Sequence, residues 1–151
     1  MEVTGTVSAI LARKGSDIWS VSPESTVFDA IQLMAEKNVG ALPVVENDQP
    51  VGVISERDYT RKVILQGKSS KDTRVNEIMT KELVTAEPGD TVSECMRLMT
   101  ERRVRHLPVL DGGRMVGILS IGDLVSWLLS AQRATIDNLH RFITGDYPSG
   151  Y

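Results

Sequence analysis

The sequence has a single cysteine, only two histidines and few aromatic residues. One cysteine excludes an internal disulfide and a metal cage built from thiolates. Cys95 is spaced with apolar neighbours as on an amphipathic helix, which favours a buried packing role. No nucleophile stands beside a base at a recognisable spacing, and neither Gly-x-Ser-x-Gly nor a phosphate-binding P-loop occurs. The sequence therefore predicts a protein that is not an enzyme and has no metal site.

Long apolar runs and a strong charge of either sign are also missing. No run approaches the roughly 20 residues that span a bilayer. The formal net charge is −3, so a broad basic surface for nucleic acid is not expected. The first eleven residues include Glu2 and lack the basic start and apolar core of a secretory signal. We expect a cytoplasmic protein that binds neither membranes nor nucleic acid.

What the sequence does contain is an internal repeat. Residues 20–58 align with residues 85–123 at a constant offset of 65 without a gap, and 14 of the 39 paired positions are identical. Repetition at a fixed offset indicates duplicated structural units. Two units that are each too small to be stable alone tend to pack together, and the clefts between them are usual places for ligands.

The pattern of each repeat is strand, helix, strand, strand, helix. Ser25-Thr26 in the first repeat and Asp90-Thr91 in the second supply side-chain oxygens that can cap the first helix, and apolar residues then follow at helical spacing. We predict strands at 18–21, 39–45 and 51–55 in the first repeat, and at 83–86, 104–110 and 116–120 in the second. The second helices are expected at 56–66 and from 121 to about 129.

These patterns predict an α/β fold of two β-α-β-β-α repeats, related by a pseudo-two-fold axis and packed as one module with a helical tail. The first repeat, with its lead-in, is expected at 7–66, a polar linker at 67–74 and the second repeat at 75–130. A C-terminal helix and an irregular tail are expected at 131–151, with a stripe of apolar residues at Ile136, Leu139, Phe142 and Ile143.

Two tetrads, Ser55-Glu-Arg-Asp58 and Ser120-Ile-Gly-Asp123, follow the last strand of each repeat and begin a helix. A serine followed three residues later by an acid is a common helix cap. A carboxylate can also accept hydrogen bonds from the vicinal hydroxyls of a ribose, and a helix N-terminus favours phosphate oxygens. Both interpretations fit the tetrads.

The repeated pattern of a hydrophobic residue, Pro-Val, a polar turn, Val-Gly, two hydrophobic residues and Ser-x-x-Asp resembles a tandem CBS-domain pair, or Bateman module. The resemblance covers about 7–129. In detail, the chain is similar to small stand-alone CBS-pair proteins of bacteria and plant mitochondria, on the segments 55–62, 66–71, 103–109 and 120–123. The resemblance implies a regulatory module that binds adenosine nucleotides (AMP, ADP, ATP or NAD(H)) in two clefts between the repeats. It also implies a homodimer formed through helices.

The resemblance assigns residues to both clefts. In each, the Asp of the tetrad would hold the ribose, the Ser would lie beside ribose or phosphate, and strand residues would enclose the adenine. One site would comprise Ser55, Asp58, Val39, Gly40, Ala41 and Ile54, with Asp90 and Cys95 from the other repeat. The second would comprise Ser120, Asp123, Val104, Arg105, His106 and Leu119, with Ser25 and Ala30 from the other repeat.

The two sites are not expected to be equivalent. The second repeat has Arg105 and His106 where the first has Gly40 and Ala41, whereas Arg57 in the first tetrad corresponds to a glycine in the second. Each site would thus have a basic group for phosphate, and the site with Gly40 would have room for a dinucleotide. Asp90 would place an acid near a phosphate. For His106, a phosphate contact and an ordinary strand role both remain open.

Because no catalytic domain is evident in this sequence, a sensor of this kind would act on a separate, unidentified protein or through a change of its own assembly. The alternative function is a protein-interaction scaffold with vestigial nucleotide sites, because serine and aspartate acting only as helix caps would leave the same sequence pattern.

Overall fold

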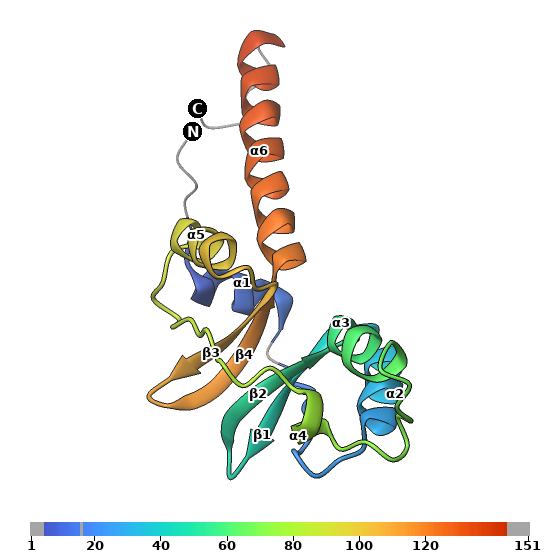
Figure 1. Cartoon of the computed structure of the whole chain (residues 1–151). Coiled ribbons are helices and arrows are strands. Elements are labelled where there is room, and N and C mark those ends of the chain that lie inside the picture. Colours follow the sequence, from blue (N-terminus) through green and yellow to red (C-terminus); the bar gives the residue numbers. More distant parts are fainter. Residues whose placement is uncertain (1–4, 16, 145–151) are drawn as a thin grey trace.

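The computed structural model describes residues 5–15 and 17–144, and it consists of two halves that are each built on an antiparallel hairpin (Figure 1). The first hairpin pairs β1 (Ala41–Glu46) with β2 (Gln49–Ser55), and the second pairs β3 (His106–Asp111) with β4 (Arg114–Ser120). Both turns have two residues with positive φ, Asn47 and Asp48 in one and Gly112 and Gly113 in the other. That geometry suits the right-handed twist of a short hairpin.

The first predicted strand of each repeat is reduced to one bridging residue. Val21 pairs in parallel with Val44 of β1, and Ala86 pairs in the same way with Val109 of β3. The rest of 18–21 and 83–86 is irregular. Each half therefore has a two-stranded sheet with a single parallel bridge at its edge.

The helices α2 (Val27–Lys37) and α5 (Val92–Arg102) begin where the sequence predicts. Thr26 Oγ1 accepts a hydrogen bond from the backbone N–H of Asp29, and Thr91 Oγ1 does the same for Glu94. These caps satisfy N–H groups that have no partner within the helix. The apolar face of each helix is buried against its own hairpin, through Val27, Ala30 and Met34 in α2 and Val92, Cys95 and Met99 in α5.

The helices after the two tetrads differ from each other. The first is interrupted: α3 (Glu56–Tyr59) continues into η1 (Thr60–Ile64), a short π-helical segment, rather than forming one regular helix over 56–66. The second is α6 (Ile121–Thr144), one continuous helix of 24 residues that rises out of the body (Figure 1). Because no glycine or proline occurs between positions 123 and 144, nothing in the sequence breaks it. Residues 145–151 and the side chain of Phe142 lie outside what the structure describes.

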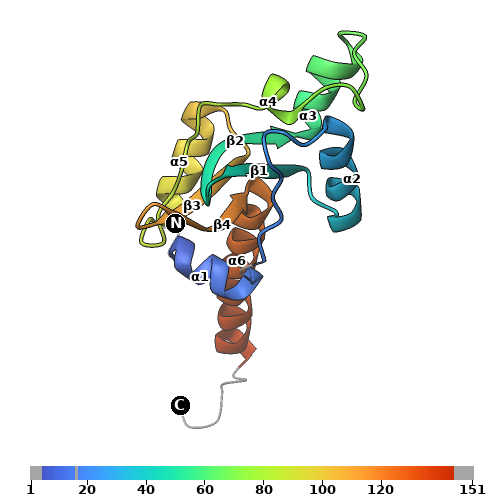
Figure 2. The same ribbon diagram turned by 90° about the horizontal axis from the view of Figure 1, so that it is seen from below.

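The two lead-in segments cross over between the halves (Figures 1 and 2). The helix α1 (Val7–Lys14) precedes the first repeat but packs in the core of the second half, where Val7 and Ile10 are buried. The short helix α4 (Val75–Ile78) packs in the core of the first half through Val75 and Ile78. Each half therefore completes its core with a segment that precedes the other repeat.

Backbone hydrogen bonds fix both crossings. Val7 N–H donates to the carbonyl of Asp90 (2.9 Å), and Val75 N–H donates to the carbonyl of Ser25 (2.8 Å). The two cores lie on either side of a contact between β2 and β4. The predicted mixed α/β fold of two repeats is confirmed. Among the described residues, no helix is both long enough and apolar enough to cross a membrane.

Candidate functional site

Both Ser-x-x-Asp tetrads form reciprocal helix caps. Ser55 Oγ accepts from the N–H of Asp58 (3.1 Å), and Asp58 Oδ2 accepts from the N–H of Ser55 (3.0 Å). The same pair of bonds joins Ser120 and Asp123, at 3.1 and 2.8 Å. The capping interpretation is therefore confirmed in both copies. A ligand role requires that the carboxylates have further capacity to accept hydrogen bonds, and each carboxylate has about four lone-pair sites.

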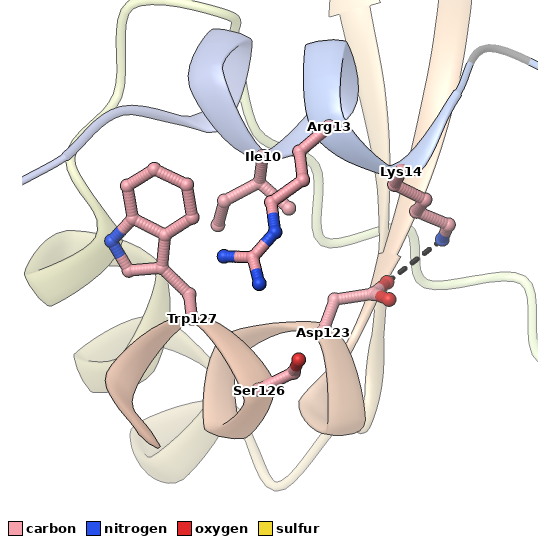
Figure 3. Close-up of a pocket in the computed structure, with 6 residues that line it drawn as sticks. All are labelled: Ile10, Arg13, Lys14, Asp123, Ser126 and Trp127. Carbon is pink, nitrogen blue, oxygen red and sulfur yellow. Dashed lines mark hydrogen bonds and ion pairs between the residues drawn. The ribbon is translucent and has the colours of Figure 1, made fainter. Parts of the chain in front are cut away.

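Each carboxylate also holds a lysine. Asp58 Oδ1 lies 2.9 Å from Lys62 Nζ and 3.4 Å from Thr80 Oγ1. Asp123 Oδ2 lies 2.7 Å from Nζ of Lys14, which comes from the end of α1 (Figure 3). Both ammonium groups also donate to a backbone carbonyl, Lys62 to that of Ile78 and Lys14 to that of Ile118. A ligand hydroxyl at either aspartate would therefore compete with an internal cation.

A large cleft of about 840 Å³ lies beside Asp58. Its wall combines both halves: Gly40, Val53, Ser55 and Asp58 come from the first, whereas Val104, Arg105 and His106 come from the second. The remaining lining residues are Glu56, Arg57, Arg61, Thr80, Glu82, Leu83, Val84 and Arg103. The volume falls within the range of about 300–1,000 Å³ typical of small-molecule sites.

The charges in this cleft favour an anionic ligand. Four arginines line it, against three carboxylates, of which Asp58 is already paired with Lys62. Arginine binds phosphate through two parallel N–H donors, so such a cluster suits a phosphate group. Among the described residues, no group of three or more His, Cys, Asp or Glu side chains is placed to hold a metal ion.

The cleft groups the residues differently from the sequence-based assignment. The sequence placed Val104, Arg105 and His106 with Asp123, whereas the structure places them across the cleft from Asp58. The reason is that β2 and β4 pack against each other at the centre of the molecule. The segment leading into β3 therefore faces the tetrad of the opposite half, a long-range relation that the repeat alignment does not contain.

Several other residues assigned from the sequence are buried in the cores rather than exposed to a cleft. Ile54 and Leu119 have no exposed surface, because alternate residues of a strand face opposite sides. In β2 it is therefore Val53, the preceding residue, that lines the cleft. The other residues placed in or against the hydrophobic interior are Ala30, Ala41, Cys95 and Val39.

Ser25 and Asp90 stabilise the beginnings of helices and the crossed segments. The hydroxyl of Ser25 lies 3.1 Å from that of Ser22, and its carbonyl binds α4. The Asp90 carboxylate accepts from the N–H of Glu87 (2.8 Å), and its carbonyl binds α1. Neither residue lines the large cleft, so the anticipated conflict between Asp90 and a phosphate does not arise there.

The pocket beside Asp123 is much smaller, at about 230 Å³ (Figure 3). Besides Lys14, it holds Arg13, whose guanidinium lies 5.9 Å from the centroid of the Trp127 ring and donates to Ser130 Oγ (2.8 Å). This volume is below the usual lower limit of about 300 Å³ for a ligand site. In this conformation the end of α1 packs beside α6, and its two cations, Arg13 and Lys14, fill the space next to Asp123.

His106 lies between the two tetrads. Burial lowers the pKa of its imidazole below the ordinary 6.5, and the positive charges of Lys14 and Arg105 lower it further, against the opposing effect of Asp123. His106 also lines the Asp58 cleft. His106 therefore lines the large cleft, while the charges of Lys14 and Asp123 at the small pocket influence the pKa of its imidazole.

Sequence reasoning missed half of the cleft. Arg61, Thr80 and Arg103 were not assigned, although strand alternation alone would have indicated Val53. Arg103 ends α5 in a left-handed conformation (φ 54°), and it lines the cleft from that position. No local sequence pattern predicts this conformation for an arginine.

Comparison with known proteins gives a consistent result. A family model for the CBS domain matches residues 7–64 and again residues 75–130. The protein named CBS domain-containing protein CBSX3, mitochondrial, of Arabidopsis thaliana is 41% identical over 152 residues, which cover 94% of this chain and 73% of that protein.

Solved structures agree. A protein with CBS domains from Burkholderia ambifaria is 53% identical with a TM-score of 0.81, over 85% of this chain and 96% of that chain. The CBS domain pair of protein MJ0100, solved in complex with 5′-methylthioadenosine and S-adenosyl-L-methionine, is 25% identical with a TM-score of 0.75, over 85% of this chain and 98% of that one.

Proposed function

Since the chain belongs to the CBS-domain family, we propose that it is a non-enzymatic regulatory module that binds an adenosine nucleotide in the cleft beside Asp58. Binding would change the affinity of the module for a partner protein and so signal energy or redox state. The observation that carries the proposal is the cleft itself, where Asp58 and four arginines from both halves line a volume of about 840 Å³.

The cleft offers a partner for each part of a nucleotide. Asp58 Oδ1, now bonded to Lys62 and Thr80, would accept the ribose hydroxyls. Val53 and Val104 would contact the adenine, and Gly40 leaves space beside it. Ligand binding by MJ0100 supports the adenosine part of the proposal, because both of its bound compounds contain adenosine.

The arginines would bind the phosphates, and they come from both halves of the molecule. Arg57 and Arg61 belong to the segment after β2, whereas Arg103 and Arg105 flank the turn between α5 and β3. A phosphate held by both pairs would draw the two halves together. A ligand regulates only if it binds one arrangement better than another, and this bridging supplies such a difference.

We propose that the two tetrads are not equivalent. The Asp58 cleft is open, whereas Asp123 is bonded to Lys14 and lies in a pocket too small for a nucleotide. The candidates for the main site are AMP, ADP, ATP and NAD(H), and its volume accommodates a dinucleotide as well as a mononucleotide. The second site would accept a ligand only after the end of α1 moves away.

Thermal unfolding of nucleotide-free protein with AMP, ADP, ATP with and without magnesium, NAD, NADH and S-adenosylmethionine tests this proposal. A ligand present at a hundredfold excess over Kd stabilises the native state by about 2.7 kcal/mol. Asp58→Ala should abolish that stabilisation. Asp123→Ala removes an equivalent cap and is the matched control, so it should retain the stabilisation. The absence of any ligand effect on the wild-type protein would refute nucleotide binding.

A second candidate is a protein-interaction scaffold whose nucleotide sites are vestigial. The observation that favours it is that capping alone accounts for both tetrads. On that reading, Asp58→Ala and Asp123→Ala would each lower stability by about 1 kcal/mol and no nucleotide would stabilise either the wild type or the variants.

We also propose a homodimer and a cytoplasmic location. The relative from Arabidopsis thaliana is mitochondrial by name, so fractionation of cells expressing the tagged protein is the direct test of location.

A further inference from the structure

His106 lies beside both Ser-x-x-Asp tetrads. It begins β3 and pairs with Ser120 across the second hairpin. Directly opposite residues of an antiparallel pair project to the same face, so the imidazole lies on the side of Ser120. Leu107 and Leu119 project to the other face and are buried in the core. Because His106 also lines the large cleft beside Asp58, its side chain lies between the two tetrads.

The first half has no counterpart of this imidazole. The equivalent residue, Ala41, pairs with Ser55 and is buried. The cleft beside Asp58 therefore receives its imidazole from the second half. Among the described residues that line this cleft, His106 is the one whose side chain ordinarily changes charge near neutral pH.

Charged groups from several elements surround His106. Burial lowers the pKa of the imidazole below 6.5, and the positive charges of Lys14 on α1 and the adjacent Arg105 lower it further, whereas Asp123 on α6 raises it. The remaining charged residues that line the cleft are Glu56, Arg57, Asp58, Arg61, Glu82 and Arg103. The imidazole is therefore mostly neutral at pH 7 in the ligand-free protein.

A phosphate group in this cleft would change that balance. The four arginines that line the cleft attract phosphate into the space that His106 also lines. A negative charge nearby favours the charged form of histidine. The imidazolium has an N–H donor on each ring nitrogen, whereas the neutral ring has only one, and phosphate oxygens are strong acceptors. Phosphate binding and protonation of His106 therefore favour each other.

We propose that His106 takes up a proton from water when a phosphate group of the ligand binds in the cleft beside Asp58, and that the imidazolium then donates a hydrogen bond to a phosphate oxygen. The inference rests on the proposed nucleotide site and adds a residue that selects for phosphate. An adenosine compound without phosphate binds without proton uptake, whereas the affinity for a phosphorylated one rises as the pH falls. The module then reports nucleotide concentration and acidity together.

Calorimetric titration of the nucleotide-free full chain with AMP counts the protons. The binding enthalpy is measured at pH 7 in PIPES, HEPES and Tris, whose ionisation enthalpies differ, and its slope against the ionisation enthalpy gives the protons taken up per AMP. AMP is itself mostly dianionic at this pH, because the second pKa of a phosphate monoester is about 6. We expect at least about half a proton per AMP, and an affinity about fivefold higher at pH 6.5 than at pH 8.

ATP and NAD are titrated in parallel with AMP. Absence of binding by all three compounds overturns the proposed function together with this inference. Binding of these compounds without proton uptake overturns this inference alone and leaves the nucleotide site in place. Adenosine is the matched ligand without phosphate, and proton uptake on its binding would overturn the phosphate contact.

Two glutamine variants assign the proton. His106→Gln should remove both the proton uptake and the pH dependence, and it should bind AMP at pH 7 with about the affinity of the wild type at pH 8. The second histidine of the chain, His140, is on α6 and does not line the cleft, so His140→Gln is the matched control that should keep the uptake. Persistent uptake in His106→Gln would assign the proton to Glu56, Asp58 or Glu82 and overturn the inference.

Proton NMR gives a second measurement that does not depend on the folding of His106→Gln. The His140→Gln protein retains His106 as its one histidine, so the imidazole resonance needs no further assignment. The titration midpoint of that resonance should lie below 6.5 without ligand and above about 7 with saturating AMP. A midpoint that AMP leaves unchanged overturns the inference.

Discussion

Two glycines at equivalent positions of the repeats allow a sharp test of how the crossed segments hold the two halves. Gly52 of β2 and Gly117 of β4 each face a lead-in segment. A Cβ at Gly52 would lie 2.7 Å from Met79 Sδ and 2.9 Å from the carbonyl oxygen of Thr80. A Cβ at Gly117 would lie 2.7 Å from a terminal methyl of Leu11. The perturbation is alanine at each site.

The nature of the neighbour decides the size of each effect. At Gly52 the obstacle is backbone, held by two hydrogen bonds between Val53 and Thr80 (3.0 and 2.9 Å). Overpacking against a fixed group costs about 1–3 kcal/mol, and each weakened hydrogen bond adds about 1 kcal/mol. At Gly117 the obstacle is the flexible end of a side chain, so the cost should stay below about 1 kcal/mol.

Urea unfolding of the two variants measures the contrast. Alanine reduces the freedom of the unfolded chain equally at both positions, so the difference between the variants isolates the native contacts. We expect Gly52→Ala to be less stable than Gly117→Ala by about 2 kcal/mol, or about 1 M in midpoint at a slope near 2 kcal/mol per M. Because Thr80 lines the large cleft, Gly52→Ala should also weaken nucleotide binding. Equal stability of the two variants, or a less stable Gly117→Ala, would refute the reasoning.

Four further predictions concern the titratable groups. Lys62→Met should tighten nucleotide binding, because the ribose would no longer compete with the lysine for Asp58. Lys14→Met should add a second binding event in calorimetry and lower the stability by less than about 1 kcal/mol. An unchanged stoichiometry with Lys14→Met would contradict our account of the second tetrad. The pKa of His106 is lowered in the folded state, so the unfolded chain takes up a proton first as the pH falls below 6.5. Stability should therefore fall over that range, and less so in His106→Gln; equal pH dependence of the two proteins in urea unfolding would exclude this role. Burial, with the negative charges nearby, raises the pKa of the Cys95 thiol to about 11, so iodoacetamide should label it in urea but hardly at all in the native protein.

The features that the sequence predicts correctly are those with a local physical cause. Thr26 and Thr91 cap their helices because a hydroxyl there meets free N–H groups, and the hairpins turn where residues tolerate positive φ. The alignment of the two repeats also found both tetrads.

The features that the sequence does not predict depend on the packing of distant segments. Ile54 was assigned to the cleft in place of Val53, because both are apolar and only their alternation with Ser55 along the strand distinguishes them. The placement of Arg105 across from Asp58 depends on how β2 and β4 meet. Lys14 lies outside the aligned repeat and reaches Asp123 only because α1 crosses to the second half.

The crossing of α1 also bears on how the molecule is made. The ribosome releases α1 before the whole of the first half, yet the core partners of α1, Leu107, Leu119 and Leu124, are synthesised only after that half. The first half can seal its core once residue 78 has emerged, whereas the second half must wait until the start of α6 is free. During translation α1 therefore remains an apolar segment without its final partner, and closing so long a loop is slow. The synthesis of α6 therefore decides when α1 can fold.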